Sequence, residues 1–228
     1  MTRKINTTAI FIIVLCAVGL VALVLTRPSP EQNQEETVKA GVTVGDTFTY
    51  SIKGIANLID ANASVPEAFY QLNMTEWYKV TITNVTSSEI FFNATWRFSN
   101  ATESQRTGKV NFKTGIGNSQ DFWAIYASGL KAGDYLRPYG ADRVTINATE
   151  SRSYRDGTRE TNKVALETEF YDVDDPTYSR AYIDYLTFYF DRQTGILVEL
   201  TDVKYYSSPQ IILVVEWKLV DSNVWNVK

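Results

Sequence analysis

The chain has 228 residues, with 22 Lys and Arg, 26 Asp and Glu, and a formal net charge of −4 at pH 7. A mildly acidic protein repels nucleic acid and anionic lipid headgroups, so neither is an expected partner. There is no histidine, which excludes Ser-His-Asp and Cys-His catalysis and His-ligated metal sites. The single cysteine excludes an internal disulfide, so the fold must be stabilised by packing.

Residues 1–26 are predicted to form a transmembrane anchor. Arg3 and Lys4 precede an apolar run from Ala9 to Leu25, which would rise about 26 Å as a helix. Cationic residues before a first apolar helix favour a cytoplasmic N-terminus, so we expect a single crossing of the plasma membrane with the rest of the chain outside. The run ends without a small-x-small cleavage site, which favours an anchor over a cleaved signal peptide.

Residues 27–40 are rich in Pro, Glu and Gln and show no periodicity, so they are predicted to be a flexible linker. Residues 41–228 are then expected to form an extracellular β domain. Gly45-Asp46 and Gly133-Asp134 each precede a predicted strand. This repetition indicates that the domain could consist of two similar halves, 42–113 and 130–219.

Most of the β domain alternates between apolar and polar residues, the pattern of half-buried antiparallel strands. The predicted strands are 47–53, 78–83, 89–98, 104–113, 143–154, 158–171, 180–190, 195–206 and 211–219. Asp156-Gly157 predicts a hairpin turn, and Gly195 fits a left-handed turn position. Aromatic residues at helical spacing predict one helix over 119–130. The expected fold class is mainly β: an N-terminal transmembrane helix plus a curved or closed antiparallel sheet with one packed helix.

Asn-x-Ser/Thr sequons are frequent beyond the predicted anchor, which favours an exported, glycosylated surface. In the predicted strands 89–98 and 143–154 the alternation places the sequon asparagines on the solvent-exposed face. The alternative is that a Thr-rich β protein contains such motifs by chance. The predicted glycosylation sites are Asn62, Asn73, Asn84, Asn93, Asn100 and Asn147.

Five short motifs carry a resemblance to a known group of proteins. They are the segments 44–50 (VGDTFTY), 129–134 (GLKAGD), 145–150 (TINATE), 159–162 (RETN) and 190–197 (FDRQTGIL). In this order they resemble membrane-anchored, extracytoplasmic archaeal proteins of uncharacterised function. The resemblance implies a surface β domain and supplies no catalytic residues. The hairpin at 190–197 is also similar to hairpins of curved-sheet lipoprotein carriers that hold acyl chains, a likeness of fold alone.

Candidate chemistry is sparse. Asp172, Asp174 and Asp175 could hold Ca²⁺ at a loop, but they lack the glycine and distal glutamate of an EF-hand, so a solvated acidic turn is favoured. Asp172, Asp174, Asp184 and Glu167 could form an acid pair for hydrolysis, but their spacing selects no pair. No catalytic residue, metal site or cofactor is therefore predicted.

The segment 178–190 is apolar on both faces and must be covered on both. The simpler cover is the predicted helix 119–130. The alternative is an aromatic-lined groove in a curved sheet that accepts an apolar ligand. Its predicted lining is Trp96, Phe98, Tyr182, Phe188, Phe190 and Trp217.

Three functions follow from these patterns. The first is a membrane-tethered, glycosylated cell-surface module that binds another envelope component without catalysis. The second is a carrier of a hydrophobic or lipid ligand in the aromatic groove. The third, with least support, is a carboxylate-dependent hydrolase. The expected partners are the membrane, through the N-terminal helix, and an envelope protein or a lipid.

Overall fold

The computed structural model describes residues 38–117, 122–171 and 181–227. These residues form one antiparallel sheet of nine strands with the order β4-β3-β2-β1-β9-β8-β7-β6-β5. The prediction of a mainly β, antiparallel fold is confirmed. The strands are β1 (Thr47–Leu58), β2 (Thr75–Val85), β3 (Glu89–Phe98), β4 (Glu103–Asn111), β5 (Ala148–Tyr154), β6 (Gly157–Phe170), β7 (Tyr182–Asp191), β8 (Leu197–Ser207) and β9 (Gln210–Ser222), with the helix α2 (Glu67–Asn73) between β1 and β2.

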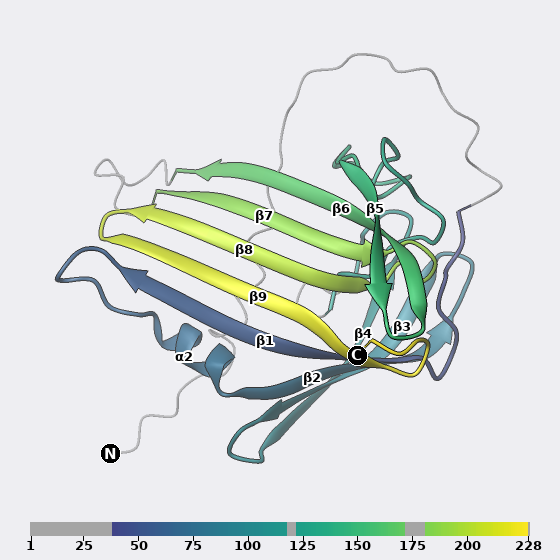
Figure 1. The fold of residues 1–228 in the computed structure, drawn as a ribbon, viewed down its shortest axis with the longest axis horizontal. Helices are drawn as coiled ribbons and strands as arrows, with labels where there is room; N and C mark the ends of the chain where they lie inside the picture. The colour runs from purple at the N-terminus through teal and green to yellow at the C-terminus, as the bar shows by residue number, and fades with distance from the viewer. Residues whose placement is uncertain (1–37, 118–121, 172–180, 228) are drawn as a thin grey trace.

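The first and last strands meet in the middle of the sheet. β1 pairs with β9, while every other ladder joins strands that are neighbours in the chain. The order therefore leaves β4 and β5 at opposite edges, and the sheet is open between them in the described residues. Figure 1 shows the sheet strongly twisted, with β3 and β4 turned away from the broad surface of β6 to β9. The connection from β4 to β5 must consequently cross the molecule.

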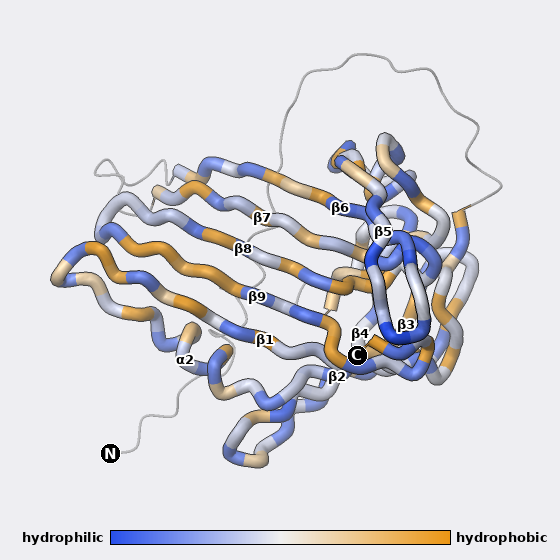
Figure 2. The backbone as a smooth tube through the Cα atoms, in the orientation of Figure 1, coloured by the Kyte–Doolittle hydropathy of each residue, from blue (hydrophilic) through white to orange (hydrophobic). Residues whose placement is uncertain are grey.

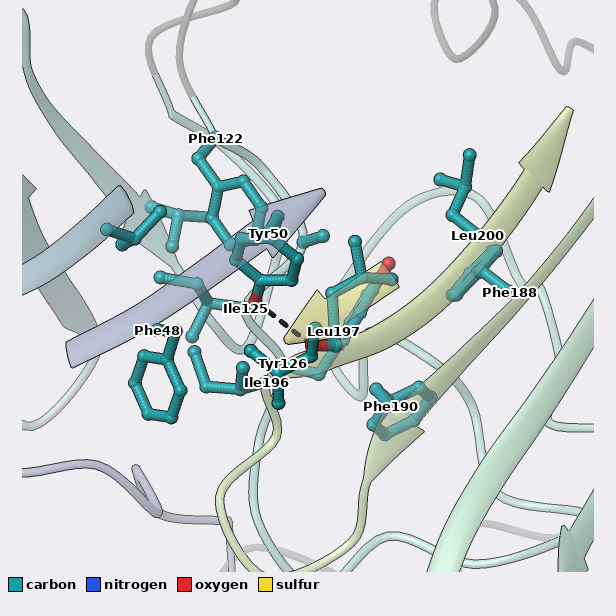
Figure 3. Close-up of a cluster of buried hydrophobic side chains, with 14 of the residues drawn as sticks. Phe48, Tyr50, Phe122, Ile125, Tyr126, Phe188, Phe190, Ile196, Leu197 and Leu200 are labelled. Atoms are coloured by element: carbon teal, nitrogen blue, oxygen red, sulfur yellow. Dashed lines mark hydrogen bonds between the residues drawn. The ribbon is translucent and has the colours of Figure 1, made fainter. Parts of the chain in front are cut away.

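This connection packs on one face of the sheet, which we call the inner face. Phe122, Ile125 and Tyr126 of the connection are buried there against residues of the strands. Tyr50 donates its hydroxyl hydrogen bond to the carbonyl of Leu197 at 3.0 Å within the same cluster (Figure 3). Burial of so many aromatic rings is the main stabilising contribution in a domain without disulfides.

The predicted helix over 119–130 is wrong for the part that the structure describes. Residues 122–130 contain no helix and form only isolated bridges, Ile125 to Ile196 and Ser128 to Lys39. Residues 124–128 are all buried, because the segment is enclosed on more than one side, whereas an amphipathic helix would expose one face. The aromatic spacing thus reflects packing of an extended chain. The helix that the described residues do form, α2, was not predicted.

The backbone of the segment 122–130 packs closely against the turn between β7 and β8. The Tyr126 amide donates to the Gly195 carbonyl at 2.8 Å. Gly195 has φ +73°, which confirms its predicted left-handed position, and a Cβ there would lie 2.1 Å from the Tyr126 carbonyl oxygen. Only glycine therefore fits.

Two turns in the first part of the chain have counterparts in the second part, and the turns of each pair contain equivalent hydrogen bonds. In the Gly-Asp turns, Asp46 Oδ2 accepts from the Thr43 amide and Asp134 Oδ2 accepts from the Lys131 amide. In the turns after β4 and β7, the amide of Gly115 donates to Asn111 and that of Gly195 donates to Asp191. The correspondence matches the turn after β4 with the turn after β7 and is limited to these turns.

The predicted anchor, residues 1–26, and all but the last three residues of the predicted linker, 27–40, lie outside the described residues. Within the ranges that the structure describes, no helix is long and apolar enough to cross a membrane.

Candidate functional site

At one end of the sheet, only five strands remain side by side. The pairing of β1 with β2 extends only as far as Tyr50 of β1, and the pairing of β6 with β5 extends only as far as Lys163 of β6. Beyond these two residues the sheet consists of β6, β7, β8, β9 and β1 (Figure 1). We call this the far end. Directly paired residues on neighbouring strands share a face, so each row of paired residues forms a rung across the sheet.

The outermost rung of the inner face is aromatic and aliphatic. It consists of Phe170, Tyr182, Tyr206, Ile211 and Leu58. The ring centroids of Phe170 and Tyr182 are 5.0 Å apart, as are those of Tyr182 and Tyr206. Phe170 and Leu58 are each 41% exposed at the two sides, whereas Ile211 in the middle is buried. Apolar surface is therefore available at this rung.

The next two rungs hold a cluster of buried charges, Asp184, Asp202 and Lys204, which we call the charged cluster. Lys204 Nζ lies 3.1 Å from Asp184 Oδ2 and 2.9 Å from Asp202 Oδ2. None of the three residues is more than 9% exposed. Their partners along the rungs include Leu186, Leu213 and Val215, so the cluster lies in apolar surroundings.

The electrostatics of the charged cluster are unbalanced. Burial, together with the Asp184 carboxyl, raises the pKa of Asp202 to about 6, despite the opposing effect of Lys204. Burial acts to lower the pKa of Lys204, but Asp202 and Asp184 outweigh it and raise that pKa. The Oδ1 atoms of Asp184 and Asp202 are buried and have no hydrogen-bond partner. These two buried oxygens therefore accept no hydrogen bond when both carboxyl groups are ionised.

The sequence analysis named Asp184 only as a candidate for an acid pair and missed Asp202 and Lys204. The sequence did contain a signal for Asp202 and Lys204. Both lie at the alternate positions of β8 that also hold Leu200 and Tyr206, and these positions face the inner side of the sheet. Two charged residues at inward positions of one strand are unusual. Alternation alone, however, could not show that β7 brings Asp184 beside Lys204.

All six residues of the predicted groove are on strands and project from the inner face, but the chain covers some of them itself. Phe188 stacks on Tyr126 with centroids 5.7 Å apart and contacts Trp123 at 5.8 Å. Phe190 lies 4.5 Å from the Tyr126 ring. These two positions belong to the packed core.

Three of the other four predicted groove residues, Trp96, Phe98 and Trp217, form one aromatic cluster with Tyr78, and Tyr182 lies apart from them. Trp96 stacks on Phe98, with centroids 5.4 Å apart, on β3. Trp217 and Trp96 both contact Tyr78, at 5.2 and 5.6 Å. Tyr182 alone belongs to the outermost rung at the far end. Of the six, it is the one next to the charged cluster, with the Lys204 ammonium 5.7 Å from its ring centroid.

The opposite face of the far end carries a second apolar surface, the outer patch. Its members are Ile55, Ile183, Tyr185, Val203, Tyr205, Ile212 and Val214, which are adjacent in the ladders of β1, β9, β8 and β7. Ile55 is 50% exposed, Tyr205 43% and Tyr185 40%. Figure 2 shows hydrophobic residues in succession along β9 and the adjoining part of β1, as expected for strands apolar on both faces.

Glutamates of β6 border the outer patch. Glu167 pairs with Tyr185 and Glu169 pairs with Ile183 across the ladder. The Tyr185 hydroxyl donates to Glu167 at 3.3 Å, and Glu167 raises the pKa of Tyr185. The patch therefore combines an apolar centre with an acidic margin.

The acidic segment with Asp172, Asp174 and Asp175 lies outside the described residues. Elsewhere, in the part of the chain that the structure does describe, no group of three or more His, Cys, Asp or Glu is placed to hold a metal ion.

The six predicted glycosylation sites are all exposed. Their amides are used differently. The Asn73 side chain accepts from the Gly54 amide at 2.9 Å and donates to the Gly54 carbonyl at 2.8 Å, on the edge of β1 beyond its pairing with β2. Asn147 Oδ1 accepts from the Ala165 amide at 2.8 Å, on the edge of β6 beyond its pairing with β5. Both side chains occupy positions that a neighbouring strand would otherwise fill.

No model of a known protein family matches this chain, and no curated protein matches it significantly. The class of protein is therefore defined by the structure itself. It is an open nine-stranded antiparallel sheet whose inner face is partly covered by its own β4–β5 connection.

Proposed function

We propose that this protein is a non-enzymatic binding module of the cell surface, tethered to the membrane by residues 1–26 and glycosylated. It recognises another protein of the envelope through the outer patch. The observation that carries the proposal is the exposure of Ile55, Tyr185 and Tyr205 within one contiguous apolar surface. A contiguous exposed apolar patch marks an interaction surface more often than scattered apolar residues do.

The chemistry of the patch defines the partner. Tyrosines are enriched at protein interfaces, because the ring buries apolar area while the hydroxyl keeps a polar contact. Glu167 and Glu169 at the margin favour a partner that presents Lys or Arg beside an apolar centre. The same glutamates repel anionic lipid headgroups, so a protein surface suits the patch better than a lipid surface.

The proposal is tested by native gel electrophoresis of detergent-solubilised membranes from the native cells. We expect the wild-type chain to migrate in a complex larger than the chain alone. The double variant Ile55→Lys, Tyr205→Lys should migrate as the single chain, because two buried ammonium groups would oppose docking. The matched control is Thr83→Lys, Thr107→Lys, at exposed positions of β2 and β4. A complex that survives the patch variant, or one containing only copies of this chain, would overturn the proposal.

A second candidate function is the carrier of a hydrophobic or lipid ligand. The observation that favours it is the partly exposed outermost rung, where Phe170 and Leu58 are each 41% exposed beside Tyr182 and Tyr206. Native mass spectrometry of the chain, purified from its own membranes, should then show a reproducible additional mass. Extraction with organic solvent should remove the ligand that accounts for this mass. A chain carrying only its glycans would rule this function out.

A further inference from the structure

The charged cluster lacks one positive charge. One ammonium, Lys204, faces two carboxylates, Asp184 and Asp202, so the cluster has a net charge of −1 when both are ionised. The side chains are only 11%, 6% and 12% exposed for Lys204, Asp184 and Asp202, respectively. A net charge removed from water is costly, so the cluster favours the uptake of a proton or of a cation.

The cluster also lacks hydrogen-bond donors. Lys204 donates to the Oδ2 atoms of both aspartates, while both Oδ1 atoms are buried without a partner. Asp184 is the clearest case, since its side chain is 94% buried and one of its oxygens still has no donor. A buried carboxylate oxygen without a donor is rare in folded proteins. Either a proton on Asp202, which hydrogen-bonds Asp184, or a donor from outside the cluster would satisfy it.

The surroundings of the cluster exclude most other cations as internal partners. At the same two rungs, the facing residues are Thr168 and Leu166 on β6, Leu186 on β7, Leu213 and Val215 on β9, and Ala56 and Gly54 on β1. None of these is titratable. Tyr182 and Tyr206 on the neighbouring outermost rung are titratable, and burial raises the pKa of Tyr206. Among the described residues of these rungs, none supplies a second positive charge, and the residue of α2 that packs over Gly54 is the apolar Phe69.

We propose that the charged cluster binds the ammonium group of an amphipathic amine whose apolar body lies along the outermost rung. An ammonium group supplies one positive charge and several N–H donors, which are the two things that the cluster lacks. A hydroxyl group would supply a donor without the charge. Phe170, Tyr182 and Leu58 offer the apolar surface for the body of the ligand. This site uses the inner face and is independent of the outer patch.

A proton competes with this ligand, because either one neutralises the cluster. The raised pKa of Asp202, about 6, places the competition in a mildly acidic range. Below that pKa the carboxyl is protonated and the cluster is already neutral. Amine affinity should therefore fall by about tenfold for a pH one unit below the pKa.

The probe is octylammonium, titrated calorimetrically into the full chain in zwitterionic nanodiscs, with empty nanodiscs as the reference. At pH 7.5 we expect saturable binding of octylammonium, with 1-octanol and octanoate at least tenfold weaker. Lowering the pH to 5 should weaken octylammonium binding about tenfold and leave 1-octanol unchanged.

The variant Asp202→Asn mimics the neutral cluster and should fold, because it removes a buried charge that has no full counterpart. It should bind octylammonium at least tenfold more weakly than wild type and lose the pH dependence. Asp221→Asn, at an exposed position of β9, is the matched control and should bind as wild type does. Equal affinities for octylammonium and 1-octanol, no saturable heat, or unchanged binding in Asp202→Asn would each overturn the proposal.

Discussion

At the scale of single residues, Asp202 makes the free energy of unfolding depend on pH. Its pKa is raised from 3.8 to about 6 in the folded chain, so the folded state holds a proton that the unfolded state has already released in this range. The unfolded state therefore binds fewer protons, and stability falls as the pH rises from about 4 through about 6. The whole effect amounts to about 3 kcal/mol at most.

The comparison of wild type with Asp202→Asn isolates this effect. Urea denaturation at pH 4.5 and pH 7.5 should show that the variant loses less stability than wild type as the pH rises. Asp221→Asn should follow wild type. If the variant and wild type lose the same free energy of unfolding, Asp202 is not the titrating group.

Asn73 is a second residue with a specific consequence, because its amide pairs with both the N–H and the C=O of Gly54. This cyclic pairing uses the amide hydrogen on the same side as Oδ1, which is the hydrogen that an N-linked glycan replaces. Asn147 uses only its oxygen. We expect glycopeptide mass spectrometry of the folded protein to find Asn147 modified and Asn73 free. Comparable occupancy at both sites would show that the Gly54 contact does not form.

Removing the same amide tests its contribution to stability. Asn73→Ala leaves the N–H and C=O of Gly54 without their partner on the open edge of β1, and should lower the free energy of unfolding by about 1–3 kcal/mol. Asn62→Ala, in an exposed loop position, is the control and should have little effect. Chemical denaturation measures both.

At the scale of elements, the connection between β4 and β5 depends on one buried cation. The Arg137 guanidinium donates to the carbonyls of Trp123 at 2.8 Å and Phe112 at 3.3 Å, and also to that of Ile125. It lies 4.2 Å from the centroid of the Tyr126 ring. Burial lowers the pKa of this guanidinium, but the carbonyl oxygens and the ring compensate for lost hydration.

Arg137→Met preserves much of the volume but leaves the carbonyls of Phe112 and Ile125 without the Arg137 donor, while that of Trp123 keeps the Ile125 amide. We expect a loss of about 3 kcal/mol or more, since a buried acceptor without a partner costs about 1–3 kcal/mol. Arg155→Met, at an exposed position in the turn between β5 and β6, is the control. Thermal unfolding should separate the two variants clearly. Equal unfolding midpoints for the two variants would contradict the stabilising role of Arg137.

The strands were accessible to sequence reasoning because each alternation is local. β3 buries Ile90, Phe92 and Ala94 while it exposes Asn93, as the pattern indicated. The connection at 122–136 was not accessible in this way. Its residues are buried by strands distant in sequence, so neither period two nor period 3.6 describes it. The pairing of β1 with β9 likewise depends on contacts that no local pattern contains. The adjacency of Asp184 and Lys204 depends on the register of the β7–β8 hairpin.

At the scale of the whole molecule, the sheet divides into a packed part and a far end. Over the packed part, the β4–β5 connection covers the inner face and aromatic rings such as Tyr126 and Phe188 fill it. At the far end, apolar residues remain exposed on both faces, and the charged cluster lies on the inner face. The end of the sheet that contributes least to the core is thus the end that carries both candidate binding surfaces.

The central claim, that the far end is the binding surface, is tested most directly by site-specific photo-crosslinking in intact cells. A photoreactive amino acid replaces Tyr205 in the outer patch and, separately, Thr83 on β2 as the reference position. We expect a single discrete protein adduct from position 205 that is absent from position 83 and is lost when Ile55→Lys is added. Equal labelling from both positions, or labelling of lipid alone from position 205, would contradict the claim.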